Sequence, residues 1–132
     1  MTELNEVFEG HWLSRIDKYR HTPRVNFGVG AVDKVGDLAK EIAKNTKCII
    51  ITDKSLRKIG IIERPNKSLE DAGFTVDIYE SEAKEPVLEE VKKIIKVVKG
   101  KNYGIDVGIG GGAVMDRAKI AAVMSETAGE LE

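Results

Sequence analysis

Residues 103–119 read YGIDVGIGGGAVMDRAK, an apolar run that leads into three consecutive glycines and then into a helical pattern. Ile105, Val107 and Ile109 alternate with smaller or polar residues, which is typical of a short strand. Beyond the glycines, apolar residues recur at helical spacing: Val114, Met115, Ala118, Ala121 and Ala122. The predicted order is strand, glycine turn, helix.

A glycine turn in this position favours an anion. Glycine has no Cβ, so its backbone N–H groups can approach a phosphate closely. A helix that begins just beyond the turn adds unpaired N–H donors and the positive end of its dipole. Gly110, Gly111 and Gly112 are therefore candidate phosphate-binding residues. The alternative is that they only form a tight strand-to-helix turn.

The first part of the chain also alternates helix and strand patterns. Residues 31–44 have the spacing of an amphipathic helix. The β-branched run 47–52 predicts a strand that is covered on both faces, with Asp53 at its carboxyl end. Residues 55–59 predict a short helical turn that ends at Gly60.

The middle of the chain continues this alternation. Residues 64–72 predict a helix that Gly73 caps, and residues 74–79 predict a second strand. The apolar residues of 86–98 keep a helical period, so we expect a helix that opens at Pro86 and closes at Gly100.

This alternation predicts the α/β class: a Rossmann-like, mostly parallel sheet with right-handed crossovers and helices on both faces. Ligands of such sheets bind at the carboxyl ends of the strands. Asp53 and Gly110 both follow predicted strands, so they share one sheet edge, which favours phosphate binding. Residues 1–132 are expected to form a single domain, with a core at 31–132 and a hairpin or irregular edge segment at 1–30 that covers a sheet edge.

The composition excludes several partners. Lys and Arg number 21 against 22 Asp and Glu, for a net charge of -1, so no bulk field recruits nucleic acid or an acidic membrane. The first ten residues lack the basic and apolar regions of a signal peptide, and no long apolar run occurs, so a cytoplasmic location is expected. Cys48 is the only cysteine, and its position in an apolar run favours a packing role over a nucleophilic one.

The usual nucleotide motifs fit the glycine turn poorly. Gly108, Gly110 and Ala113 match GxGxxG only loosely, and no acidic strand follows at the spacing that this fingerprint asks for. The Walker pattern GxxxxGK[ST] does not occur.

Residues 110–119, GGGAVMDRAK, resemble the GGGSxxDxAK motif of the iron-containing (group III) alcohol dehydrogenases. Residues 23–30, PRVNFGVG, are similar to the family's PxxxxFGxG but with one residue fewer between Pro and Phe. Residues 51–56 are similar to its TDxxL, and Glu85-Pro86 to its acidic or Asn residue before proline. The four motifs keep the family's order along nearly the whole chain. The chain therefore looks like the N-terminal nucleotide-binding domain of that family.

The resemblance implies a dinucleotide site. Gly110, Gly111, Gly112 and Ala113 would hold the pyrophosphate of NAD or NADP. Asp53 would hydrogen-bond the adenosine ribose hydroxyl and repel a ribose phosphate, which favours NAD. Asp116 would lie near the nicotinamide side, and its structural alternative is a carboxylate in the first turn of a helix. Lys119 either pairs with a neighbouring carboxylate or is solvated.

Two residues depart from the family pattern. Ala113 stands where the family usually has Ser, which removes one hydroxyl donor to the phosphate. Asp106 lies inside an apolar strand, where a buried carboxylate needs a partner or a raised pKa.

The resemblance also limits the expected activity. Family enzymes carry a second, all-helical domain whose Asp and His residues bind iron or zinc, and that domain is expected to be absent here. His11 and His21 are the only histidines, and they do not make such a site. We therefore expect the dinucleotide-binding domain of an NAD(P)-dependent alcohol or aldehyde oxidoreductase, catalytically incomplete by itself, with the metal only in full-length relatives.

Three alternatives remain open. The first is a domain similar to the glycerol dehydrogenases, which use a similar glycine loop. The second is a non-catalytic partner subunit whose apolar last helix packs on a separate C-terminal chain or on a second copy. The third is a phosphoreceiver domain with Asp53 in an acidic pocket and Asp106 as acceptor.

Overall fold

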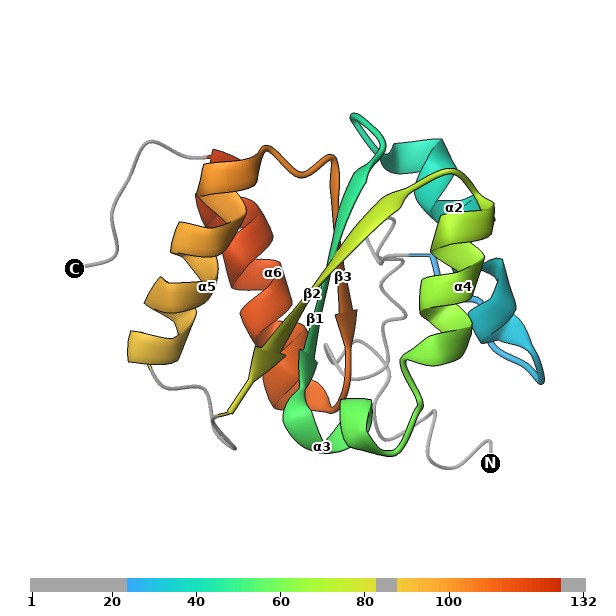
Figure 1. Ribbon diagram of the computed structural model, residues 1–132, viewed down its shortest axis with the longest axis horizontal. Coiled ribbons are helices and arrows are strands. Elements are labelled where there is room, and N and C mark those ends of the chain that lie inside the picture. The colour runs from blue at the N-terminus through green and yellow to red at the C-terminus, as the bar shows by residue number, and fades with distance from the viewer. Residues whose placement is uncertain (1–23, 83–87, 127–132) are drawn as a thin grey trace, which may run out of the picture.

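Strand β1 (Lys47–Asp53) lies at the centre of a three-stranded parallel sheet in the computed structural model, which describes residues 24–82 and 88–126. Strand β2 (Thr75–Ser81) pairs with one side of β1 and strand β3 (Ile105–Ile109) with the other (Figure 1). Residues 48–52 of β1 are 0% exposed. The complete burial of these five positions explains the continuous β-branched run, because none of them faces water.

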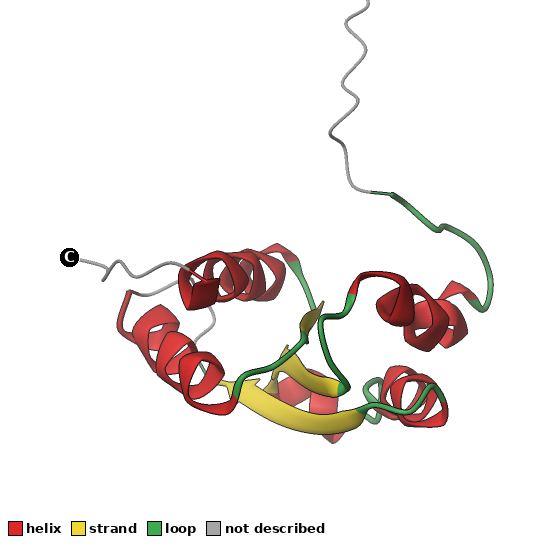
Figure 2. Ribbon diagram, turned by 90° about the horizontal axis from the view of Figure 1, so that it is seen from above, coloured by secondary structure: helices red, strands yellow, loops and turns green. Residues whose placement is uncertain are grey.

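Helices cover both faces of the sheet (Figure 2). One face carries α2 (Val35–Ile42) and α4 (Glu63–Asp71), which pack on Ile50. The other face carries α5 (Leu88–Lys101) and α6 (Gly112–Glu126), which pack on Ile49 and Ile51. The predicted α/β class, the parallel sheet and the two helical layers are confirmed.

Helices α2 and α4 approach each other closely at Gly36. A Cβ at this position would lie 2.1 Å from the carbonyl oxygen of Ser68, so only glycine fits. The Ser68 hydroxyl accepts a hydrogen bond from the Gly36 N–H (3.0 Å) and donates one to the Asp33 carbonyl (2.7 Å). Asp33 belongs to the 3₁₀ turn η2 (Ala31–Lys34), so these two bonds fix the start of the first helix on α4.

The predicted boundaries are mostly confirmed, with one clear error. The first helical pattern is divided into η2 and α2, and the short turn after β1 is α3 (Lys54–Lys58). Gly73 lies one residue beyond the C-cap of α4, with a positive φ of 96°. The prediction that Gly100 closes the next helix is wrong, because α5 continues through it to Lys101. Asn102 then takes the left-handed conformation, which Asn tolerates, with φ of 51°.

Most of the predicted edge segment lies outside the described residues, as does the predicted helix start at Pro86. Residues 24–27, which are described, have no regular secondary structure. Val25 and Phe27 are 83% and 99% exposed, so this part of the segment does not cover a sheet edge. Arg24 forms an ion pair with Glu41 at 2.5 Å, between two exposed side chains.

Candidate functional site

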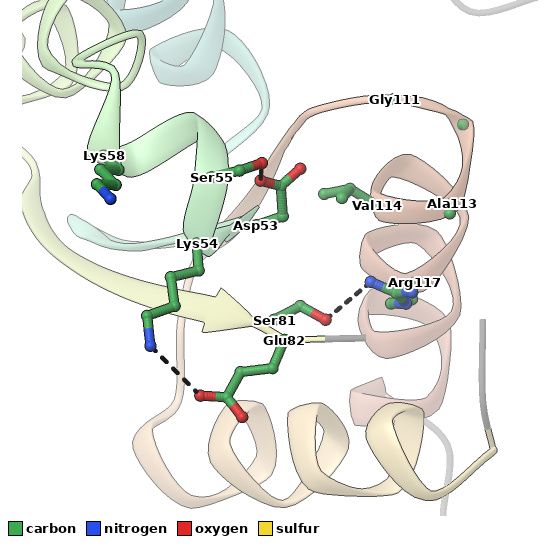
Figure 3. Close-up of a pocket in the computed structure, with 11 residues that line it drawn as sticks. Asp53, Lys54, Ser55, Lys58, Ser81, Glu82, Gly111, Ala113, Val114 and Arg117 are labelled. Carbon is green, nitrogen blue, oxygen red and sulfur yellow. Dashed lines mark hydrogen bonds and ion pairs between the residues drawn. The ribbon is translucent and has the colours of Figure 1, made fainter. Parts of the chain in front are cut away.

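A pocket of about 590 Å³ opens at the carboxyl edge of the sheet (Figure 3). Three segments meet there: α3, the end of β2, and the start of α6. Helices α3 and α6 follow the carboxyl ends of β1 and β3, and the third segment is the carboxyl end of β2 itself. The carboxyl ends of parallel strands are the place where α/β sheets bind ligands. The lining residues are Asp53, Lys54, Ser55, Lys58, Ser81, Glu82, Gly111, Gly112, Ala113, Val114 and Arg117.

The glycine turn brings the start of α6 to this pocket. Gly110 needs to be glycine, because its φ is 156° and a Cβ would lie 2.8 Å from the Cβ of Val114. The Gly111 carbonyl accepts hydrogen bonds from the N–H groups of Val114 (3.1 Å) and Met115 (3.0 Å), which starts the helix. The first N–H groups of a helix have no carbonyl partner within it, so they are donors for an anion.

The fold requires glycine at position 110 but not at positions 111 and 112. Neither has a left-handed φ, and an added Cβ would meet no atom within 4 Å at either position. The fold therefore tolerates a side chain at both positions. The missing side chains instead leave open space in the pocket, of the kind that lets a phosphate reach the backbone N–H groups.

Asp53 ends β1 and caps α3. Its Oδ1 accepts hydrogen bonds from the Ser55 hydroxyl and from the Leu56 N–H, the latter at 2.8 Å. These two bonds hold the pKa of the Asp53 carboxyl below its usual value, so it stays ionised. A carboxylate has about four acceptor sites, so Asp53 can accept further hydrogen bonds from a ligand while it caps the helix.

The sequence reasoning missed Arg117. Its side chain is 0% exposed, and Nη1 donates a hydrogen bond of 2.8 Å to the Ser81 hydroxyl at the end of β2 (Figure 3). Its charge is one of the smaller causes that lower the pKa of Asp53. Arg117 follows Val114 by three residues, so both share the inward face of α6, and an arginine on that apolar face was the signal. The guanidinium gives the pocket a fixed positive charge.

Charged side chains form the pocket rim. Lys54 lies 3.9 Å from Glu82, and Arg57 pairs with Glu80 at 2.6 Å, which ties α3 to the end of β2. Exposed pairs of this kind contribute about 1 kcal/mol at most. Their main effect is on the approach of a ligand, since Lys54 and Lys58 line the pocket and their positive charges attract anions.

Two predicted site residues do not line the pocket. Gly110 shapes the turn behind it, and Asp116 lies on α6 with its side chain 61% exposed. Lys119 lies 3.8 Å from Asp116 and its side chain is 75% exposed, so it pairs with a neighbouring carboxylate while it remains largely solvated. The first-turn alternative for Asp116 is wrong, because α6 begins at Gly112 and Asp116 is its fifth residue. A cofactor role for Gly110 and Asp116 stays a prediction.

Asp106 lies away from the pocket. It is paired in register with Ile49, whereas Asp53 lies four residues further along β1. At about 3.3 Å per residue, the two carboxylates are separated by roughly 13 Å along the strands. They do not share an acidic pocket, which removes the structural basis of the phosphoreceiver alternative. Burial raises the pKa of the Asp106 carboxyl to about 6, as the sequence analysis anticipated.

The described residues hold no group of three or more His, Cys, Asp and Glu side chains that would bind a metal ion. His11 and His21 lie outside this part of the chain. In the same residues no helix is both long and apolar enough to cross a membrane. Cys48 is fully buried in β1, as its packing role requires.

The parallel sheet, its two helical layers and the glycine turn at its carboxyl edge define a Rossmann-like α/β domain. A family model described as iron-containing alcohol dehydrogenase matches residues 22–132. The chain belongs to this family, and it corresponds to the family's N-terminal domain.

Curated relatives agree with this assignment. Alcohol dehydrogenase 4 of Saccharomyces cerevisiae (strain YJM789) is 34% identical over 119 residues, which are 90% of this chain and 31% of the relative. Long-chain-alcohol dehydrogenase 1 of Geobacillus thermodenitrificans is 31% identical over 103 residues, or 78% of this chain and 26% of the relative. The NAD-dependent methanol dehydrogenase of Bacillus methanolicus is 32% identical over 83% of this chain and 28% of its own.

Solved structures show the same fold. The NADH-dependent butanol dehydrogenase A of Thermotoga maritima superposes with a TM-score of 0.76 at 27% identity, over 86% of this chain and 29% of its own. A 1,3-propanediol oxidoreductase gives a TM-score of 0.75 at 30% identity, over 83% of this chain and 28% of its own. The chain thus spans less than a third of the length of these relatives.

Proposed function

We propose that this chain binds a nicotinamide dinucleotide, NAD in preference to NADP, at the glycine-turn pocket. In this proposal it is the cofactor-binding part of an alcohol or aldehyde oxidoreductase. The observation that carries the proposal is the pair Gly111 and Gly112. These residues are free of side chains at the pocket although the fold itself leaves room for a Cβ at both positions.

The pocket offers three kinds of group to a dinucleotide. The start of α6 supplies N–H donors and a positive dipole end for the pyrophosphate. Buried Arg117 adds positive charge on the same side. Ala113 offers a backbone N–H but no hydroxyl, so this part of the site relies on the backbone and on charge.

Asp53 supports the choice between the two cofactors. Its carboxylate stays ionised and can accept hydrogen bonds from the two hydroxyls of an adenosine ribose. The same negative charge disfavours a phosphate on that ribose. Two of the relatives are named for the use of NAD or NADH: the NAD-dependent methanol dehydrogenase and the NADH-dependent butanol dehydrogenase.

The reaction itself needs more than this pocket. The bound cofactor supplies hydride transfer, and the protein has to polarise the substrate oxygen. The described residues bring together no group of three or more His, Cys, Asp and Glu side chains that would hold a metal ion. We infer that this chain binds the cofactor and that it does not oxidise alcohols without further protein.

Calorimetric titration with NAD and NADP tests the proposal. The wild-type chain is compared with a variant that carries both Gly111→Ala and Gly112→Ala. We expect the wild type to bind NAD and the variant to bind at least about tenfold more weakly, a loss of about 1.4 kcal/mol, because two methyl groups enter the phosphate space.

The matched control is Gly100→Ala. Gly100 also lies in a helix and an added Cβ there also meets no atom within 4 Å, but it is remote from the pocket. Gly112→Ala and Gly100→Ala lie in helices and are expected to maintain or raise stability, by up to about 1 kcal/mol, and Gly111→Ala meets neither a left-handed φ nor a close atom, so a loss of binding is not a loss of folding. The proposal fails if the folded wild type does not bind NAD or NADP at millimolar concentration.

A further inference from the structure

Arg117 places a full positive charge close to the start of α6. It is the sixth residue of a helix that begins at Gly112, and a helical side chain leans towards the N-terminus of its own helix. The helix dipole already gives that end about half a positive charge, so cations normally stabilise the opposite end. The guanidinium and the dipole therefore act in the same direction, and both favour an anion at the start of α6.

The guanidinium is held beside the pocket by the end of β2. Its Nη1 donates a hydrogen bond of 2.8 Å to the Ser81 hydroxyl, and both residues line the pocket (Figure 3). Ser81 is paired in register with Asp53, and neighbouring strands lie about 4.8 Å apart. Arg117 therefore links the two parts of the proposed site, the glycine turn before α6 and the strand end that carries Asp53.

Burial decides how Arg117 can act on a ligand. Arg117 is 0% exposed and Ser81 is 1% exposed, so a ligand in the pocket does not reach the guanidinium directly. A phosphate can instead contact the backbone of residues 111–113, which line the same pocket and precede Arg117 by about one helical turn. A buried charge is screened less by water and salt than a charge at the surface, so Arg117 acts on that phosphate through space.

Other charged and titratable groups lie around the guanidinium. Its charge helps to lower the pKa of Asp53 on β1 and opposes the rise in the pKa of Tyr79 on β2. The Tyr79 hydroxyl donates a hydrogen bond of 3.1 Å to Glu90 on α5, and Glu82 lies at the rim with its side chain 80% exposed. Carboxylates stay ionised above pH 6, and the pKa of Tyr79 is raised to about 12, so these groups form a nearly constant background between about pH 6 and pH 10.

We propose that Arg117 is a positioning residue for the cofactor phosphates. Its buried charge holds the phosphate nearest the adenosine ribose against the glycine turn, without direct contact. The class of ligand is then any nucleotide with an adenosine diphosphate group, whatever its second half is. This inference rests on the proposed function, because it takes the ribose to lie at Asp53 and the phosphates at the start of α6.

Two substitutions at this position test the proposal by calorimetric titration with NAD and with ADP. Arg117→Met removes the charge and keeps an unbranched side chain, whereas Arg117→Lys keeps the charge. At about pH 6 we expect Arg117→Met to bind both ligands at least about tenfold more weakly and Arg117→Lys to stay within about threefold of the wild type. Equal losses in the two variants, or no loss in Arg117→Met, would overturn the proposal. Urea unfolding without ligand shows whether each variant is folded.

A pH profile separates the charge from the shape of the side chain. Arginine stays protonated, whereas lysine has a pKa of about 10.4 that burial lowers. The NAD affinity of Arg117→Lys, relative to that of the wild type, should therefore fall by about tenfold between about pH 6 and pH 10. A constant ratio between folded proteins would contradict the role of the charge, and this test does not need Arg117→Met to fold.

Lys54→Met is the matched control for burial. Lys54 also lines the pocket, but its side chain is 71% exposed. We expect this variant to lose less affinity for NAD than Arg117→Met, and its loss should disappear at about 0.5 M salt while that of Arg117→Met persists. Salt that abolishes both losses equally would contradict the action of a buried charge.

The cofactor proposal and the role of Arg117 fail in different ways. A folded wild type that binds NAD with an affinity that Arg117→Met retains contradicts only the role of Arg117. A wild type that binds ADP but neither NAD nor NADP contradicts only the cofactor proposal, and the titrations with ADP then decide the role of Arg117. A wild type that binds none of the three ligands contradicts both.

Discussion

Asp53 combines a structural and a proposed binding role, and one substitution separates them. Asn caps helices as well as Asp does, so Asp53→Asn should keep α3 in place and change the free energy of unfolding by no more than about 1 kcal/mol. It removes the negative charge that disfavours a ribose phosphate. We expect the ratio of NAD to NADP affinity to fall by about tenfold, measured by calorimetry with both cofactors.

If Asp53→Asn changes the free energy of unfolding but leaves the ratio of NAD to NADP affinity unchanged, Asp53 only caps α3 and does not select the cofactor. The pH dependence gives a second check. The pKa of the folded carboxyl is lowered, so the charge and any selectivity it confers persist as the pH falls to the usual titration range of Asp. Selectivity should be constant above that range.

The pKa of Asp106 is shifted in the opposite direction to that of Asp53, so we expect its contribution to stability to fall as the pH rises. Its pKa in the folded state is raised to about 6, first by burial and then by Glu126. The folded protein therefore holds this proton more tightly than the unfolded chain, and the associated stability is present at about pH 4 and lost as the pH rises through about 6.

The variant Asp106→Asn removes this titration without a change of shape. We expect it to be more stable than the wild type at neutral to alkaline pH, by on the order of 1 to 2 kcal/mol after solvent screening of a partly exposed group. The difference in stability between the variant and the wild type should vanish near pH 4, where Asp106 is protonated in the folded protein. Urea unfolding at both ends measures it, and a difference that does not depend on pH would contradict the prediction.

The sequence located some site residues better than others. Asp53 and the glycines were predictable because both follow strands, and the carboxyl ends of parallel strands share an edge. Arg117 was not, because its contact with Ser81 joins positions 36 residues apart, and helical spacing does not tell which inward residue reaches the pocket.

The contact between α2 and α4 rests on one missing side chain. In Gly36→Ala the new Cβ would lie 2.1 Å from the Ser68 carbonyl oxygen, so the two helices must move apart. The hydrogen bond between the Gly36 N–H and the Ser68 hydroxyl would lengthen with them. We expect a loss of about 1 to 3 kcal/mol in the free energy of unfolding, typical of overpacking.

Urea unfolding of this variant beside Gly100→Ala provides the comparison. Both changes add one methyl group to a helix, and only the first lacks space for it. Equal stability of the two variants would show that α2 can shift on α4 without loss.

The periodicity of the sequence predicted well which helices and strands exist. It predicted less well where each element ends and which elements it packs against. The strands were predictable because β-branched runs and alternation are strong signals. The end of α5 was not, because the helix penalty of Gly100, about 1 kcal/mol, is small beside the packing of the buried face of that helix. The spacing of α6 likewise did not show that Met115 would be exposed while Val114 and Ala118 are covered by the sheet.

Cys48 allows the stability of the whole molecule to be followed. Its thiol is 0% exposed in the central strand, and burial raises its pKa to about 12, with Asp106 as a smaller cause. Only the thiolate reacts with disulfide reagents, so labelling requires the sheet to open. We expect no labelling under native conditions on the time scale of minutes and complete labelling in denaturant.

The same thiol reports cofactor binding. NAD at 100 times its dissociation constant stabilises the folded state by about 2.7 kcal/mol, which should slow labelling by about 100-fold where opening is global. The variant with alanine at positions 111 and 112 should be protected by about tenfold at most at that NAD concentration, because it binds NAD at least about tenfold more weakly. Rapid labelling of the native wild type would show that β1 opens locally.

For the molecule as a whole, the alternation of elements was enough to predict a parallel sheet with helices on both faces. It did not predict the strand order or which surfaces stay open, because these depend on contacts between distant segments. The half-covered β3 beside the fully covered β1 is visible only once the strands are placed.

The central position of β1 has a consequence for synthesis. Of the three described strands it is the first to leave the ribosome, and its partners follow much later, with β2 ending at residue 81 and β3 at residue 109. Until both have emerged, Ile49, Ile50 and Ile51 face solvent in an unpaired β-branched segment. Such a segment associates with other chains and is a target for chaperones. The strand that is most protected in the finished domain is therefore the most vulnerable one in the nascent chain.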